Sequence, residues 1–158
     1  MNHPCQVSRA LDEEHRANLD LLGRAERAWA QNARAEWPAI AAQLVRHLEQ
    51  EVERHFAFEE QHLFARMAQA GDGDLAALLT EEHDSIRAVA EELLPLVRAV
   101  ASGTSVAGDA DALRRLVLEL TERQVAHIQK ETMALLPMLD DLLDAQTDRE
   151  LAFAYTCD

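Results

Sequence analysis

Two halves of this chain carry the same pair of histidine motifs, and this repeat constrains the fold more than any other feature of the sequence. Residues 11–15 and 79–83 have the sequences LDEEH and LTEEH. A His-x-x-x-Glu motif follows each of them, at residues 55–59 and 127–131, beginning 40 and 44 positions after the preceding histidine. Such a repeat predicts two similar helix hairpins related by a pseudo-twofold axis. A site on that axis would receive the same side chains from both halves.

The composition favours helices throughout the chain. Ala, Leu, Glu and Arg, all good helix formers, dominate the 158 residues, which include only 5 Gly, 4 Pro and 4 % aromatic residues. Apolar side chains recur at helical spacing and predict long helices over residues 8–32, 38–71, 74–101 and 109–145. Three short connections make successive helices antiparallel neighbours. The predicted fold is therefore all-α, an up-down-up-down antiparallel four-helix bundle over about residues 8–145, with a short fifth helix over about residues 147–156.

Local signals add detail to these helices. Ser8 is the predicted N-cap of the first helix. Pro95 predicts a kink or an early end in the third helix, and Pro137 predicts a bend in the fourth. Thr147 and Glu150 form a T-x-x-E pattern, which predicts a capping box at the start of the fifth helix.

The charge of the chain excludes several kinds of partner. With 29 acidic and 15 basic residues, the formal charge is −14, so neither nucleic acid nor an anionic membrane surface is an expected partner. No apolar run reaches the roughly 18 residues that a membrane span needs, and the N-terminus lacks the apolar segment of a signal peptide. We therefore expect a cytoplasmic protein in which Cys5 and Cys157 are free thiols.

The histidine motifs predict one polar layer inside the bundle. Positions i and i+4 lie about 6 Å apart on one helix face, so each His-x-x-x-Glu motif can direct an imidazole and a carboxylate toward one centre. The histidine of each EEH motif interrupts an apolar stripe. At about 1.5 Å of rise per residue, the distances of these side chains from the predicted turns differ by only about 3 Å. The predicted layer consists of His15, His55, Glu59, His83, His127 and Glu131.

Metal ions are the expected partners of this layer. A buried carboxylate or imidazolium without a partner would cost several kcal/mol. Imidazole nitrogens and carboxylate oxygens suit iron, manganese or zinc. Two ions held by six such groups would each have fewer than six ligands, so small exogenous ligands could enter. The expected arrangement has Glu59 and Glu131 as bridges, His15 and His55 on one ion, and His83 and His127 on the other.

The remaining polar and aromatic residues have simpler expected roles. His3 and His47 are expected to be ordinary surface residues, because His3 precedes the first helix and His47 lies among glutamines. The role of His62 stays open: it could be an extra ligand or a residue that contacts the ligands from behind. Gln124 lies one turn before His127 and could donate a hydrogen bond behind it. Packing is the expected role of Tyr155, Trp29 and Trp37.

These motifs resemble the hemerythrin-like, or HHE cation-binding, family. The matching segments are EEH at 13–15, HFAFEEQHLF at 55–64, EEHDSI at 81–86 and HIQKETMALLPML at 127–139. The resemblance implies a single domain over residues 1–158 with a non-haem di-iron centre, bridged by carboxylates and by an oxo or hydroxo group. It also implies binding of dioxygen, another small diatomic ligand or peroxide.

Two positions differ from the oxygen-carrying members of that family. Those proteins have a second histidine where this chain has Arg87, and an aspartate five residues after the last histidine where this chain has Glu131, four after it. The differences point away from reversible oxygen transport. Three functions stay open: a module that binds or senses oxygen, nitric oxide, peroxide or iron; a di-iron enzyme that reduces peroxide or nitric oxide; and a structural or regulatory bundle stabilised by metal.

Overall fold

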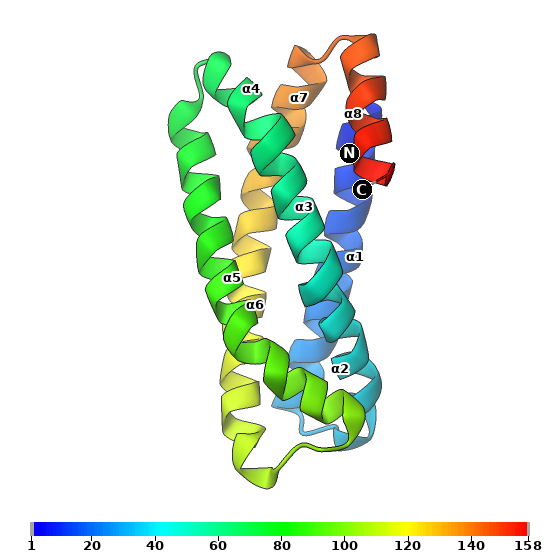
Figure 1. The fold of residues 1–158 in the computed structure, drawn as a ribbon, viewed down its shortest axis with the longest axis vertical. Coiled ribbons are helices and arrows are strands. Elements are labelled where there is room, and N and C mark those ends of the chain that lie inside the picture. Colours follow the sequence, from blue (N-terminus) through cyan, green and yellow to red (C-terminus); the bar gives the residue numbers. More distant parts are fainter. Residues whose placement is uncertain (1, 158) are drawn as a thin grey trace.

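The computed structural model describes residues 2–157, apart from the side chain of Glu51, and these residues form helices and no strands (Figure 1). The first rod is α1 (Gln6–Ala30). The second consists of α2 (Trp37–Arg46), η2 (His47–Val52), α3 (Glu53–Phe58), η3 (Glu59–Leu63) and α4 (Phe64–Gln69). The third is α5 (Gly73–Ser102), and the fourth consists of α6 (Ala110–Lys130), η5 (Glu131–Leu135) and α7 (Leu136–Leu142). The chain continues with α8 (Ala145–Cys157), and single 3-10 turns precede the second and fourth rods, at η1 (Arg34–Glu36) and η4 (Ala107–Asp109).

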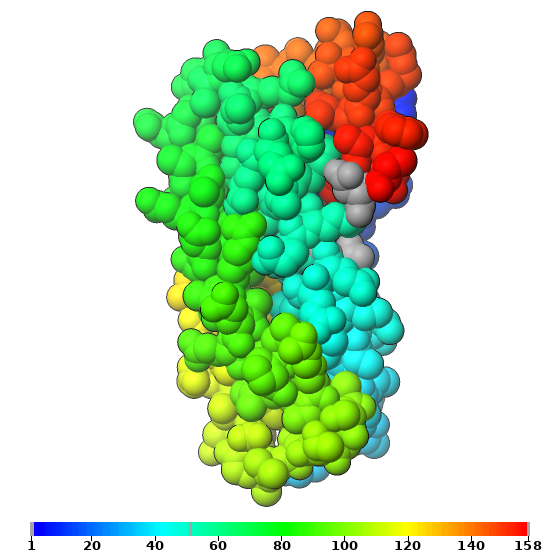
Figure 2. Space-filling model, in the orientation of Figure 1, coloured from blue at the N-terminus to red at the C-terminus, as the bar shows by residue number. Residues whose placement is uncertain are grey.

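The arrangement of the rods confirms the predicted four-helix bundle. The first rod packs against the second and fourth, and α5 packs between the second and fourth on the other side. Successive rods run in opposite directions (Figure 1). The added helix α8 packs on α1 and lies lengthwise along it, near the end of the bundle where α1 begins (Figure 1 and Figure 2). Among the described residues, no helix has both the length and the apolar character needed to cross a bilayer.

Three short π-helical segments interrupt the second and fourth rods. Two of them begin at the glutamates that end the His-x-x-x-Glu motifs, since η3 starts at Glu59 and η5 starts at Glu131. Wider π turns often occur at functional sites, because they change the direction in which side chains point. Pro137 lies in the first turn of α7, directly after η5. The fourth rod therefore continues through the proline instead of ending at it.

The start of α1 differs from its prediction. Ser8 is fully buried within the helix, and Cys5 occupies the N-cap position without a side-chain hydrogen bond that caps the helix. Instead, the carboxylate of Asp148 in α8 accepts hydrogen bonds from the backbone N–H groups of Gln6 and Val7, at 2.9 and 3.0 Å. The cap of the first helix thus comes from the last helix, which no local pattern could indicate.

Two other local predictions have different outcomes. The helix α8 begins before Thr147, and the side chain of Asp144 accepts a 2.8 Å hydrogen bond from the Thr147 backbone N–H. The predicted capping box of Thr147 and Glu150 is therefore wrong, because Asp144 fills that role earlier. Of the two outcomes predicted for Pro95, the early end is wrong, because α5 runs on to Ser102, whereas the helix changes direction in its C-terminal third, which agrees with a kink (Figure 1).

The apolar core consists of two clusters on either side of the polar layer. The two tryptophans belong to the first cluster, with stacked rings whose centroids lie 5.3 Å apart, as expected for packing residues. The histidines of the repeat fall between the two clusters along every rod. The first cluster includes Leu22, Leu44, Leu93 and Leu120, and the second includes Leu11, Met67, Leu79 and Leu135.

Candidate metal centre

The structure brings all six predicted side chains together in the interior, and each is at most 4 % exposed. Their nitrogen and oxygen atoms form two groups, and within each group the atoms lie within 4.8 Å of one another. Both groups contain Glu59 and Glu131. The first group adds His15 and His55, and the second adds His83 and His127. Two buried His/Glu clusters that share two carboxylates are consistent with a binuclear metal site.

The Nε2 atoms of the histidines face the shared carboxylates. Glu131 lies between the two groups, with Oε2 2.9 Å from Nε2 of His15 and Oε1 2.5 Å from Nε2 of His127. Glu59 contacts Nε2 of His55 at 2.5 Å through Oε1 and Nε2 of His83 at 3.1 Å through Oε2. Each carboxylate therefore touches one histidine of each group, as a bridging ligand would.

Several of these close contacts are not hydrogen bonds. Nε2 of His15, Oε2 of Glu59 and both carboxylate oxygens of Glu131 are buried without a correctly oriented donor or acceptor. Buried polar atoms are rarely left in this state, because each costs free energy. Lone pairs that converge on a common point repel one another and are stabilised by a cation placed between them. The residues present therefore suit the metal that the sequence predicts.

The outer nitrogens of two histidines contact acidic or hydroxyl groups. Nδ1 of His55 lies 3.2 Å from Oε1 of Glu14 and shares a 3.2 Å hydrogen bond with the hydroxyl of Tyr155. Nδ1 of His83 lies 2.9 Å from Oε1 of Glu60. Such contacts place the imidazole proton on Nδ1, which leaves the Nε2 lone pair directed into the site.

The other two histidines have contacts at equivalent positions. Nδ1 of His127 lies 3.5 Å from Oε2 of Glu82, and Nδ1 of His15 shares a 3.4 Å hydrogen bond with Thr132. Glu82 is the residue before His83, just as Glu14 is the residue before His15. The second glutamate of each EEH motif thus contacts the histidine of the next rod. The motif repeat contained this signal, but the sequence analysis did not assign these glutamates a role.

The electrostatics of the metal-free layer favour charged pairs. Burial opposes an imidazolium at His83, but the carboxylates of Glu131, Glu59 and Glu60 outweigh it and raise the pKa to about 9. His55 shows the same competition, and its carboxylate neighbours raise its pKa well above the usual value. Burial would raise the pKa of Glu131, but the surrounding histidines lower it well below its ordinary value. Without metal, the layer therefore holds protons as its cations.

Two predictions about the other histidines were wrong. His3 is 2 % exposed, with Nδ1 2.6 Å from Oδ2 of Asp140, and His47 is 3 % exposed. Nε2 of His47 lies 2.9 Å from Oε1 of Gln124, which is also buried. His62 is partly exposed, with its ring against Phe58, and it belongs to neither group of candidate ligands.

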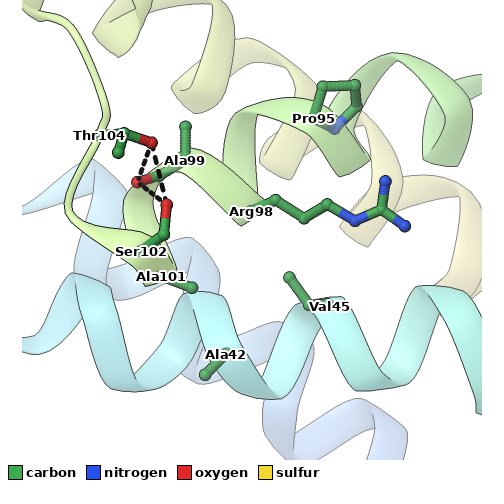
Figure 3. A pocket seen from close by; sticks show the side chains of 8 residues that line it. All are labelled: Ala42, Val45, Pro95, Arg98, Ala99, Ala101, Ser102 and Thr104. Atoms are coloured by element: carbon green, nitrogen blue, oxygen red, sulfur yellow. Dashed lines mark hydrogen bonds between the residues drawn. The ribbon is translucent and has the colours of Figure 1, made fainter.

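Two cavities differ sharply in their relation to the layer. A groove of about 720 Å³ lies between α2 and the C-terminal part of α5, where Val45, Pro95 and Arg98 line it (Figure 3). None of the six candidate ligands borders that groove. A much smaller cavity, of about 10 Å³, is lined by four of them and by neighbouring residues of the first, second and fourth rods. Despite its size, the smaller cavity is the one that belongs to the candidate centre.

A comparison with known families agrees with this geometry. A model of the hemerythrin HHE cation-binding domain matches residues 6–139, which include all six candidate ligands and exclude α8. A search of curated proteins found no match. The match spans most of the chain, and the chain belongs to the hemerythrin family of HHE cation-binding domains.

Proposed function

We propose that this protein is a non-haem di-iron protein that binds or senses oxygen, nitric oxide, peroxide or iron at an open, carboxylate-bridged centre. One observation carries the proposal: two groups of buried histidines converge on the same two glutamates. Two cations placed in these groups would each be held by two imidazoles and would share both carboxylates. The metal ligands in this proposal are His15, His55, Glu59, His83, His127 and Glu131.

The chain itself supplies orientation, exclusion of water and proton balance. The hydrogen bonds at Nδ1 of His15, His55 and His83 hold these imidazoles so that Nε2 faces inward. The ring of Phe56 stacks on His83 with centroids 3.7 Å apart, and Phe64 lies on the same imidazole at 5.3 Å, so aromatic side chains shield this ligand. When bound, a pair of iron ions would supply a redox-active centre with free positions for a small ligand. Metal uptake would displace the protons that the metal-free histidines hold.

Iron is the proposed metal, although manganese and zinc favour similar donors. The six-residue layer contains no thiolate, which argues against soft metals such as copper(I). Its four imidazoles argue against magnesium and calcium. The small cavity beside the layer has room for about one water-sized group, which excludes larger organic substrates. This supports a diatomic ligand or peroxide over a larger partner.

Anaerobic loading with Fe(II), followed by metal analysis, tests the proposal directly. We expect about two iron ions per chain and a change in the optical spectrum on addition of oxygen, nitric oxide or peroxide. A stable adduct supports binding or sensing, whereas repeated consumption of peroxide or nitric oxide supports the alternative of a di-iron enzyme. A protein that takes up no iron, or binds it without any response to these ligands, would contradict the proposed function.

A further inference from the structure

A second buried polar pair lies next to the candidate metal centre and has no role in holding it. Nε2 of His47 and Oε1 of Gln124 are 2.9 Å apart, and both residues are 3 % exposed. His47 is the first residue of the π-helical segment η2, and Gln124 lies on α6, one turn before His127. The pair therefore crosses the bundle from the second rod to the fourth. Neither residue belongs to the two groups of candidate ligands.

The surroundings of His47 fix the direction of this hydrogen bond. Burial lowers the pKa of His47, so the neutral imidazole carries a single N–H. Its Nδ1 atom is buried without a partner, and an imidazole N–H in that position would lose a hydrogen bond altogether. The proton therefore belongs on Nε2, which donates to Oε1 of Gln124. With its oxygen engaged in this way, the amide of Gln124 has its N–H₂ group directed away from His47.

Gln124 also lines the small cavity beside the candidate ligands. The cavity has a volume of about 10 Å³, enough for one atom group the size of water. Within the described part of the chain, the contact of Gln124 with His47 uses Oε1 and leaves the amide N–H₂ group for another acceptor. Asn18, His15, His55, His127 and Glu131 also border the cavity. The imidazoles and the carboxylate would be occupied by metal, which leaves the amides as the uncommitted polar groups of its wall.

We propose that Gln124, oriented by His47, is a ligand-positioning residue that donates a hydrogen bond to the outer atom of a small molecule bound at the centre. The centre would then favour ligands whose outer atom carries negative charge or an accessible lone pair, such as azide or a reduced form of dioxygen. Ligands with a poorly accepting outer atom would gain nothing from it. The inference rests on the proposed function, because it needs metal in the six-residue layer.

The orientation can be tested on the metal-free protein. Long-range ¹H–¹⁵N correlation spectra distinguish the two neutral tautomers of an imidazole. We expect His47 to carry its proton on Nε2, and Gln124→Met to change the Nε2 and Nδ1 shifts of His47. A proton on Nδ1 would overturn the inference, because His47 would then accept from the amide and turn the Gln124 oxygen toward the cavity.

The hydrogen bond itself can be tested by azide titration of the iron-loaded protein. Gln124→Met keeps the length of the side chain and removes the donor, and we expect azide to bind about tenfold more weakly while the iron content stays unchanged. Gln124→Glu keeps an acceptor for His47 but places a carboxylate at the cavity, so it should weaken azide binding further. The exposed Gln69→Met is the matched control and should bind azide like the wild type.

The outcomes separate this inference from the proposed function. Full iron content with equal azide affinity in wild type, Gln124→Met and Gln124→Glu would overturn the role of Gln124 and leave the di-iron centre intact. A wild-type chain that takes up no iron would contradict the proposed function, and it would thereby overturn the inference that rests on it. If Gln124→Met does not fold, the Gln124→Glu titration and the tautomer of His47 in the wild type still decide between the two orientations.

Discussion

The sharing of Glu131 between the two groups predicts an unequal effect of ligand substitutions on metal content. Glu131 belongs to both groups of candidate ligands, whereas His15 belongs to one. Replacing Glu131 by alanine should therefore weaken both metal positions. Replacing His15 should weaken only the first position, because every member of the second group stays in place.

The magnitudes follow from counting ligands in the two groups. The wild type should hold about two ions, His15→Ala about one, and Glu131→Ala fewer than one, because loss of a bridge removes a ligand from each ion. Glu59→Ala should match Glu131→Ala, since Glu59 is also shared. His47→Ala is the control of a buried histidine outside both groups, and its metal content should equal that of the wild type.

Glu131→Ala should also destabilise the metal-free protein. Glu131 is fully buried and lies 3.7 Å from Nε2 of both His55 and His83, whose pKa values it helps to raise, so its removal leaves buried positive charge without one of its partners. Breaking a buried pair in this way costs about 3–5 kcal/mol of unfolding free energy. For a chain of this size, the melting temperature should fall by roughly 6–20 °C.

Elemental analysis after loading with iron and desalting gives the stoichiometry, and circular dichroism of the metal-free variants gives the melting temperature. Dichroism at the start of the scan confirms that each variant is folded. Equal metal loss in Glu131→Ala and His15→Ala would refute the shared-carboxylate reasoning, as would two ions retained in Glu131→Ala. Loss of one ion in His47→Ala would show that the ligand set was chosen wrongly.

Four further predictions concern α8, the first helix and the effect of protonation. Tyr155→Phe removes the hydroxyl that holds Nδ1 of His55, so metal affinity measured by chelator competition should fall up to about tenfold; unchanged affinity would argue against a positioning role for α8. Asp148→Ala removes the tertiary cap of α1 and should lower the unfolding free energy by about 1–2 kcal/mol in denaturant titrations, and an unchanged midpoint would contradict that role. The pKa of His83 is raised to about 9 in the folded protein, so the stability that this group contributes is complete below pH 6.5 and is lost as pH rises through 9. The melting temperature of the metal-free protein should therefore fall between pH 6.5 and 9. At pH 7, metal uptake should release about two protons, from His55 and His83, as measured by calorimetry in several buffers.

Much of the architecture could be predicted because its signals are local. Helical spacing of apolar residues, short connections and scarce glycine predict antiparallel rods, and the rise per residue then sets the level of every side chain. The i, i+4 spacing of His55 with Glu59 and of His127 with Glu131 places both motifs in the interior. The structure brings these residues together with His15 because the rods are straight enough for the number of residues from the turn to give the height of each side chain along the bundle.

The errors arose where a distant residue decides the outcome. The cap of α1 comes from Asp148, about 140 positions away in the sequence, and the contact of His3 with Asp140 spans a similar separation. No local pattern contains either contact. Such pairs depend on how α8 and the fourth rod close over the N-terminus, which only the folded chain determines.

The prediction for His47 was wrong for a different reason, because the sequence did contain a signal that His47 is buried. It lies seven residues after Ile40 and three after Leu44, which are positions on one helix face, and both of these residues are buried. The neighbouring glutamines suggested a polar face, and His47 was therefore predicted to lie at the surface. Continuing the apolar stripe through a polar residue would have predicted a buried histidine that needs a partner, and Gln124 is that partner.

The six candidate ligands follow the pseudo-twofold repeat fully, but the residues that contact their outer nitrogens do not. Glu60 and Thr132 each follow the last residue of a His-x-x-x-Glu motif and contact Nδ1 of the histidine from an EEH motif. One is a carboxylate, further paired with Arg87 at 2.8 Å, and the other is a neutral hydroxyl. A carboxylate makes an imidazole a stronger donor to metal than a hydroxyl does. Two ions held by identical ligand sets would therefore not be equivalent, and a small ligand would meet two different faces of the same centre.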